Sequence, residues 1–262
     1  MRLSLVVHFL ANVVRDLRGS NSSARSMLIN ISRFVLVQKY IKEWVDKEYD
    51  LFVNCVRYDF SENEKENKQL PLYKELHALW EKHFVDIKDV TFERVVKKSN
   101  LMSAVEKIKV IVVNSSKSSN KLDYKENPHL RVIAIGGLTL SRGLTLEGLL
   151  VSYFYRNTST FDVLMQMGRW FGYRIGYEDL FQIWTSQTSA RWYEEIVKSA
   201  EDLKADLKDM YDQHLTPKDF GIRVRDNCAE LQITASNKMR SSYNLSIQYS
   251  FYGNIYDTPF LV

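Results

Sequence analysis

The sequence predicts an α/β fold in which a parallel sheet is flanked by helices. Short apolar runs at 108–113, 132–135 and 149–154 are bounded by glycine or by small polar residues, which is typical of buried strands. Segments with the apolar period of a helix precede and follow these runs. A chain that alternates strands with helices or loops in this way builds a parallel sheet with right-handed crossovers.

The composition indicates a chain with a sizeable core that folds in a reducing compartment. The 262 residues suffice for one large domain, and the net charge of +4 is compatible with a phosphate-bearing partner without requiring one. The two cysteines, Cys55 and Cys228, have no CxxC spacing, which excludes a disulfide scaffold and a zinc ribbon. We therefore expect a cytoplasmic protein.

The N-terminal stretch superficially resembles a signal peptide, because an arginine precedes a short apolar run. Asn12, Arg15, Asp16 and Arg18 follow directly, and the apolar stretch is too short to cross a bilayer. Residues 2–18 are instead predicted to form an amphipathic helix. No other stretch predicts a membrane span, so no membrane partner is expected.

The first half of the chain is predicted to contribute one strand and several helices. A run of glycine, serine and asparagine at 19–23 ends the leading helix, residues 27–31 form a short strand, and residues 33–49 form a helix. A charge-rich helical section follows from about 49 to 98, interrupted by the solvated loop SENEKENKQLP.

The second half is predicted to complete the sheet. Beyond the three apolar runs, a further strand is expected at 180–185 and a long amphipathic helix at 189–211. A polar loop is expected at 117–128, and a short helix or turn begins at Thr216. From residue 222 onward the chain is β-like and aromatic, which indicates an appended part.

The stretch from Arg131 to Arg174 carries the strongest candidate for chemistry. The run 132–135 ends in Gly136 and Gly137, and a second loop follows at Ser141-Arg142-Gly143. A short helix then begins at Ser159, which has Asp162 at the spacing of a capping box. We expect its polar residues to gather at the carboxyl end of the sheet, where ligands bind in open α/β folds.

The helix that follows Ser159 places Asp162, Gln166 and Arg169 on one stripe, and Arg174 stands just beyond it. Aromatic residues are interleaved with the two arginines, so the segment is apolar enough to be largely buried. Buried guanidinium groups need an anionic partner, because an unpaired charge in the interior is costly. The alternative for each residue alone is a surface arginine or a helix-ending glycine.

These residues also carry a family resemblance. The segment SRGLTLEGL resembles motif V of superfamily two helicases, and QMGRWFGYR resembles motif VI. The longer wording GGLTLSRGLTLEGL…LMQMGRWFGYR…GYEDL resembles more closely the Z-one domain family of proposed endonucleases. Proteins of that family are helicase-like and are associated with bacterial restriction and phage-defence gene clusters.

The resemblance implies a RecA-like parallel sheet, the second lobe of a helicase, with a small β-rich C-terminal extension. It divides the chain into a leading helix at 1–24, a lobe at 25–212 with a helical insertion near 49–100, and an extension at 213–262. It also implies roles for particular residues. The expected arginine fingers are Arg169 and Arg174; the nucleotide-binding residues are Gln166, Gly168, Gly143 and Glu147; the nucleic-acid-binding residues are Arg142, Ser141, Asn30, Ser32, Arg33 and Asn114.

For Asn30, Ser32 and Arg33 a second interpretation is equally open, namely a helix-capping serine beside a surface arginine. Motif VI in the general superfamily has different spacing, since here Gln166 stands two residues before Gly168. The sequence pattern of the Z-one domain family is therefore the closer match.

The chain has no GxxxxGK[ST] loop, which holds ATP phosphates in a complete ATPase. ATP and Mg are therefore expected only when a first lobe, missing from this chain or supplied in trans, joins it, and the chain alone is expected to be inactive. The five histidines are scattered, so no metal site is predicted.

The partners expected from the resemblance are DNA and other subunits of a defence system. We predict the arginine-supplying part of a DNA-dependent ATPase or endonuclease. One alternative is a catalytically silent module that docks DNA or protein, with its arginines paired to carboxylates such as Asp162, Glu147 or Asp179. Another is a nuclease centre in the C-terminal extension.

Overall fold

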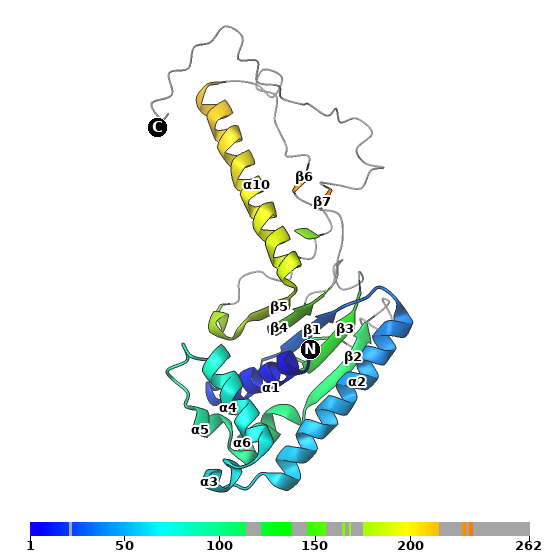
Figure 1. Cartoon of the computed structure of the whole chain (residues 1–262), viewed down its shortest axis with the longest axis vertical. Coiled ribbons are helices and arrows are strands. Elements are labelled where there is room, and N and C mark those ends of the chain that lie inside the picture. Colours follow the sequence, from blue (N-terminus) through cyan, green and yellow to red (C-terminus); the bar gives the residue numbers. More distant parts are fainter. Residues whose placement is uncertain are drawn as a thin grey trace, which may run out of the picture.

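The computed structural model describes residues 1–20, 23–113, 122–137, 146–155, 164–165, 168, 175–214, 227–228 and 231–232. At its centre is a five-stranded sheet in the order β2-β3-β1-β4-β5, in which every neighbouring pair is parallel. The parallel sheet and its flanking helices confirm the predicted α/β fold (Figure 1). The strands are β1 (Arg25–Asn30), β2 (Ile108–Val113), β3 (Arg131–Gly136), β4 (Leu149–Phe154) and β5 (Gln182–Thr185).

The strands agree closely with the apolar runs in the sequence. β2 and β4 begin and end where predicted, whereas β1 begins earlier, because Arg25 continues the parallel register opposite Arg131 of β3. The strand β5, predicted at 180–185, is shorter than predicted. Leu180 is buried in a 3₁₀ turn (Glu178–Leu180) that precedes β5 and is not part of the strand.

Helices account for most of the remaining described chain. α2 runs beyond its predicted end and continues into a π-helical turn (Cys55–Asp59). The section predicted to be helical at 49–98 contains the longer helix α4, with the short helix α3 before it and the short helix α5 after it. The helices are α1 (Arg2–Leu17), α2 (Val35–Asn54), α3 (Glu64–Asn67), α4 (Pro71–His83), α5 (Phe92–Val95), α6 (Lys98–Val105) and α10 (Gln187–Asp212).

Alternating residues of the central strand divide the core into two layers. Met27 and Ile29 of β1 face the layer formed by α1, α2, α4, α5 and α6, which Figure 1 shows on one side of the sheet. Leu28 faces the opposite layer, where Leu164 and the start of α10 cover the sheet. This period of two is the expected consequence of strand geometry.

α10 packs on the sheet only through its first turns. Trp192 and Ile196 are buried there, and the helix then runs away from the sheet (Figure 1). Its later part exposes apolar side chains such as Val197 and Tyr211. Of the expected C-terminal extension, the structure describes only residues 213–214 and one antiparallel pair, β6 (Asn227–Cys228) with β7 (Leu231–Gln232).

The path of the chain makes the carboxyl end of β1 the natural place for a site. From β1 the chain continues to β2 and β3 on one side, and it then crosses to β4 and β5 on the other. In open α/β sheets, ligands bind outside the carboxyl ends of the strands where the winding reverses in this way. No helix in the described part of the chain combines the length and apolar character that crossing a bilayer requires.

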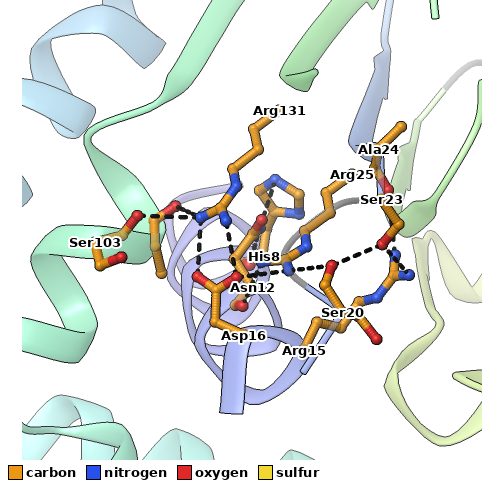
Figure 2. Close-up of polar contacts among 11 residues, drawn as sticks. His8, Asn12, Arg15, Asp16, Ser20, Ser23, Ala24, Arg25, Ser103 and Arg131 are labelled. Atoms are coloured by element: carbon orange, nitrogen blue, oxygen red, sulfur yellow. Dashed lines mark hydrogen bonds and ion pairs between the residues drawn. The ribbon is translucent and has the colours of Figure 1, made fainter. Parts of the chain in front are cut away.

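The opposite, amino-terminal end of the sheet is held by a buried cluster of charges (Figure 2). Asp16 of α1 forms ion pairs with Arg25 at the start of β1, at 2.6 Å, and with Arg131 at the start of β3, at 2.8 Å. Both guanidinium groups are almost completely removed from water. One carboxylate therefore joins a helix to two neighbouring strands.

Backbone carbonyl groups accept further hydrogen bonds from these arginines, while Nε of Arg25 has no partner among the described residues. Nη1 of Arg25 donates to the carbonyl oxygen of Asn12 at 2.7 Å, and Nη1 of Arg131 donates to that of Ala104 at 2.7 Å. Ala104 lies in the last turn of α6, where carbonyl groups lack helical partners and the helix dipole favours a cation. Arg15 donates to Ser23 at 2.8 Å and lies over the ring of Tyr177.

His8 lies beside this cluster and is held neutral. Burial, followed by the charges of Arg25 and Arg131, lowers the pKa of His8 to about 3. Asn12 Nδ2 donates to the carbonyl oxygen of His8 at 2.8 Å and lies 3.1 Å from His8 Nε2. The cluster therefore gains no further positive charge from the imidazole near neutral pH.

Removal of the shared carboxylate should destabilise the protein strongly. We expect Asp16→Asn to lower the free energy of unfolding by about 3–5 kcal/mol, because it leaves two buried guanidinium groups without an anion. The matched control is Asp89→Asn, since Asp89 is a half-exposed partner of Arg18 and its loss should cost less than about 1 kcal/mol. Urea unfolding measures both values, and equal effects of the two substitutions would contradict this assignment.

His8 should make stability depend on pH in acid. The unfolded chain takes up a proton near the ordinary pKa of 6.5, whereas folded His8 takes it up only at about 3. Stability is therefore fully present above pH 6.5 and falls as the pH drops toward 3, by at most about 1.4 kcal/mol per pH unit. In His8→Gln this contribution should vanish, so the stability difference between wild type and variant should change across this window. A difference that is independent of pH would refute the neutral, buried histidine.

Candidate functional site

The carboxyl end of β1 brings together three of the residues predicted to bind nucleic acid. Asn30 is the last residue of the strand, and Ser32 and Arg33 lie in the turn that leads to α2. Because β1 is the central strand, this turn lies at the middle of the sheet edge. The three side chains nevertheless have different surroundings.

Asn30 is fully buried, and neither its amide nitrogen nor its amide oxygen has a partner among the described residues. It pairs in register with Phe154 of β4, and on its other side it borders the end of β3. Two residues after Leu28, it lies on the sheet face that α10 and Leu164 cover. A buried amide without a partner costs free energy, so a ligand that bonds to it would remove a penalty.

Ser32 is used to build the turn between β1 and α2. Its hydroxyl oxygen accepts the backbone N–H of Phe34 at 3.1 Å, and its carbonyl oxygen accepts Nε2 of Gln38 at 2.8 Å. Gln38 is buried in the first turns of α2 and so ties the helix back to the strand exit. These bonds support the interpretation of Ser32 as a structural residue of the turn.

Arg33 is exposed, and among the described residues it forms no ion pair. Its guanidinium carbon lies 5.1 Å from the centre of the Phe34 ring. The turn that carries Arg33 packs closely against Gly137 at the exit of β3. A Cβ atom at Gly137 would lie 3.2 Å from the Cα atom of Arg33 and from the carbonyl oxygen of Ser32. The double glycine of the sequence therefore lets two strand exits meet.

The described residues of the segment 164–168 lie against the start of α10. Leu164 is buried, and its carbonyl oxygen accepts the hydroxyl of Tyr193 at 3.0 Å. A Cβ atom at Gly168 would meet the ring of Tyr193 at 3.5 Å. Gly168, predicted to bind nucleotide, thus lies on the layer of the core that also receives Asn30.

Glu147 lies at the other end of the sheet, before the first residue of β4. Its carbonyl oxygen accepts the hydroxyl of Ser26 at 2.7 Å, and its side chain is exposed. The next residue, Gly148, has a positive φ, and a Cβ atom there would lie 1.8 Å from the carbonyl oxygen of Ala24. This glycine is therefore required by a close approach of two backbones. The structure does not bring Glu147 together with the β1 exit.

The other predicted site residues lie outside the described residues. They are Arg169, Arg174, Gln166, Gly143, Arg142, Ser141 and Asn114. Among the carboxylates proposed as internal partners of the arginines, Asp179 bonds to Arg18 at 2.6 Å, and Asp162 also lies outside the described residues.

Sequence reasoning missed the charge cluster at the amino-terminal end of the sheet. The available signal is an arginine immediately before each of two apolar strands, in RSMLIN and RVIAIG. Within the described ranges, no group of three histidine, cysteine, aspartate or glutamate side chains is arranged to hold a metal ion. A cavity of about 370 Å³ lies between α1, α2 and α4, and no predicted site residue lines it.

The comparisons with known proteins return one family. The family model described as Z1 domain matches residues 1–231, which cover most of the chain. No match was found among curated proteins or among solved structures.

The unpartnered amide of Asn30 leads to a prediction on stability. Asn30→Val should raise the free energy of unfolding of the ligand-free chain by about 1 kcal/mol, because it removes a buried polar group without a partner and suits a central strand. Ser152→Ala, which removes from β4 a buried hydroxyl that also has no partner among the described residues, is the control and should also be tolerated. Chemical denaturation measures both. A loss of stability in Asn30→Val alone would show that the amide bonds within the chain.

Proposed function

The chain belongs to the Z1 domain family, and we propose that it is the helicase-like second lobe of a DNA-dependent ATPase or endonuclease of that family. In this proposal it supplies arginine side chains to ATP and magnesium that a first lobe holds. DNA passes along the carboxyl end of the sheet, and the biological setting is a bacterial restriction or phage-defence system.

One observation carries this proposal. Asn30 is buried and has no hydrogen-bond partner among the residues that the structure describes; it lies at the carboxyl end of the central strand, on the same layer of the core as Leu164 and Gly168. Arg169 directly follows Gly168 in the sequence, and Gln166 stands between the two described positions. Among the described residues, a buried polar group without a partner and the two positions on either side of Gln166 therefore share one side of the sheet.

The chemistry asked of the arginines is electrostatic. In phosphoryl transfer, negative charge spreads over the oxygens of the γ-phosphate, and an arginine that meets it stabilises the transition state. Arg169 and Arg174 are the residues assigned to this role. Asn30 would donate to a phosphate oxygen or accept from a nucleotide through its two unpartnered atoms.

The test is ATP hydrolysis in the presence of DNA and of the lobe that carries the phosphate loop. Arg169→Ala and Arg174→Ala should each lower the turnover rate by about a thousandfold, with substrate binding less affected. Arg191→Ala is the matched control, because Arg191 lies exposed on α10 and its loss changes the net charge equally. Wild-type rates in both finger variants would remove the assignment.

The structural use of several arginines in this chain favours a second candidate function. Arg15, Arg18, Arg25 and Arg131 all donate to carboxylate, carbonyl or hydroxyl groups of the chain itself. The lobe would then be a silent module that docks DNA or protein. Salt-dependent DNA binding that no nucleotide changes would favour this function.

A further inference from the structure

The first turns of α2 expose an unusual run of apolar side chains at the site edge. Phe34 and Tyr40 are 59% and 62% exposed, and the aliphatic residues Val35, Leu36 and Val37 between them are exposed as well. Elsewhere in α2, Val45 and Phe52 are buried against the core. Apart from Leu51 near the other end of α2, the strongly exposed apolar side chains of this helix gather at the end that adjoins the β1 exit.

The same stretch is basic. Residues 32–42 read SRFVLVQKYIK, which contains Arg33, Lys39 and Lys42 and no acidic residue. Lys42 is paired with Asp46 one turn further on. The two cations that precede it stand directly beside the two exposed rings in the sequence, and the Arg33 guanidinium lies over the Phe34 ring.

The surface is held in place by its supports. The hydroxyl and carbonyl groups of Ser32 fix the turn to Phe34 and Gln38. Gly137 packs tightly against the other side of the turn, where a Cβ atom would lie 3.2 Å from the Cα atom of Arg33. A ring carried by a backbone that is already ordered loses less conformational entropy when a flat partner covers it.

We propose that Phe34 and Tyr40 stack with unpaired bases of a nucleic-acid strand whose phosphates contact Arg33 and Lys39. Aromatic faces accept any base, and neighbouring cations follow the backbone, which is how proteins bind single strands without sequence preference. A polyanion fits a segment that carries cations and no carboxylate. The proposal rests on the DNA-binding part of the proposed function and adds that the strand is unpaired and held by its bases.

The first experiment uses the full chain and a fluorescent oligothymidylate of about 20 nucleotides. Phe34→Ala and Tyr40→Ala should each weaken binding, measured by fluorescence anisotropy, by about tenfold. Phe34→Trp should retain the wild-type affinity, because it keeps an aromatic face. The matched controls are Tyr58→Ala and Tyr211→Ala, which remove rings that are 76% and 77% exposed in the π-helical turn after α2 and in the last turn of α10.

The second experiment separates bases from phosphates. An abasic oligonucleotide of equal length should bind wild type more weakly, and Phe34→Ala should then cause no further loss. Arg33→Ala should weaken the binding of both oligonucleotides and reduce the slope of affinity against salt by about one unit.

The outcomes distinguish base stacking, DNA binding without stacking, and a protein interface. If wild type binds and the Phe34 and Tyr40 variants bind equally well, stacking is overturned while the proposed function stands. If wild type binds neither oligonucleotide at low salt, the stacking proposal and the DNA-binding part of the proposed function are both wrong. If the alanine variants instead abolish self-association in sedimentation experiments without changing DNA binding, the surface is a protein interface and the stacking proposal is wrong.

Discussion

The ion pairs of Asp16 with Arg25 and Arg131 are the constraint on which the rest of the fold depends. They fix α1 to the first residues of two adjacent parallel strands, and Arg131 also binds the carbonyl groups at the end of α6. Buried pairs of this kind contribute little net stability relative to apolar packing, but they are costly to break. Their value here is registry, because one carboxylate can satisfy both arginines only when β1 and β3 start at the same level.

This arrangement gives the two ends of the sheet different tasks. The amino-terminal end is closed, with its arginines paired and His8 kept neutral by burial. The carboxyl-terminal end has a buried amide at Asn30 with no partner in the described part of the chain, an exposed arginine and exposed rings. Parallel strands align all their carboxyl ends on one side, so polar groups that end different strands converge there, and closure of the other end does not obstruct them.

The β1 exit also shows how a structural role and a binding role divide among neighbouring residues. Ser32 bonds within the turn, while Arg33 next to it makes no ion pair with a described residue. The exposed arginine and the structural serine fit the second interpretation in part, although Ser32 bonds within the turn and the N-cap of α2 is Phe34. Contact of these residues with nucleic acid stays a prediction. The chain belongs to the Z1 domain family, and nucleic acid at this end of the sheet is part of the function proposed for it.

The sequence by itself determined the elements of this protein. The apolar runs of β2 and β4 and the amphipathic pattern of α1 gave their positions, because period and turn residues are local properties. Only the tertiary structure decided which polar residues meet. Glu147 precedes β4 and bonds to Ser26 near the start of β1, so it lies at the end of the sheet opposite the β1 exit, because parallel strands begin at one end of a sheet and finish at the other. Likewise, Arg131 reaches Asp16 across 115 residues of sequence and meets Arg25 there, through strand pairing in register that no local pattern encodes.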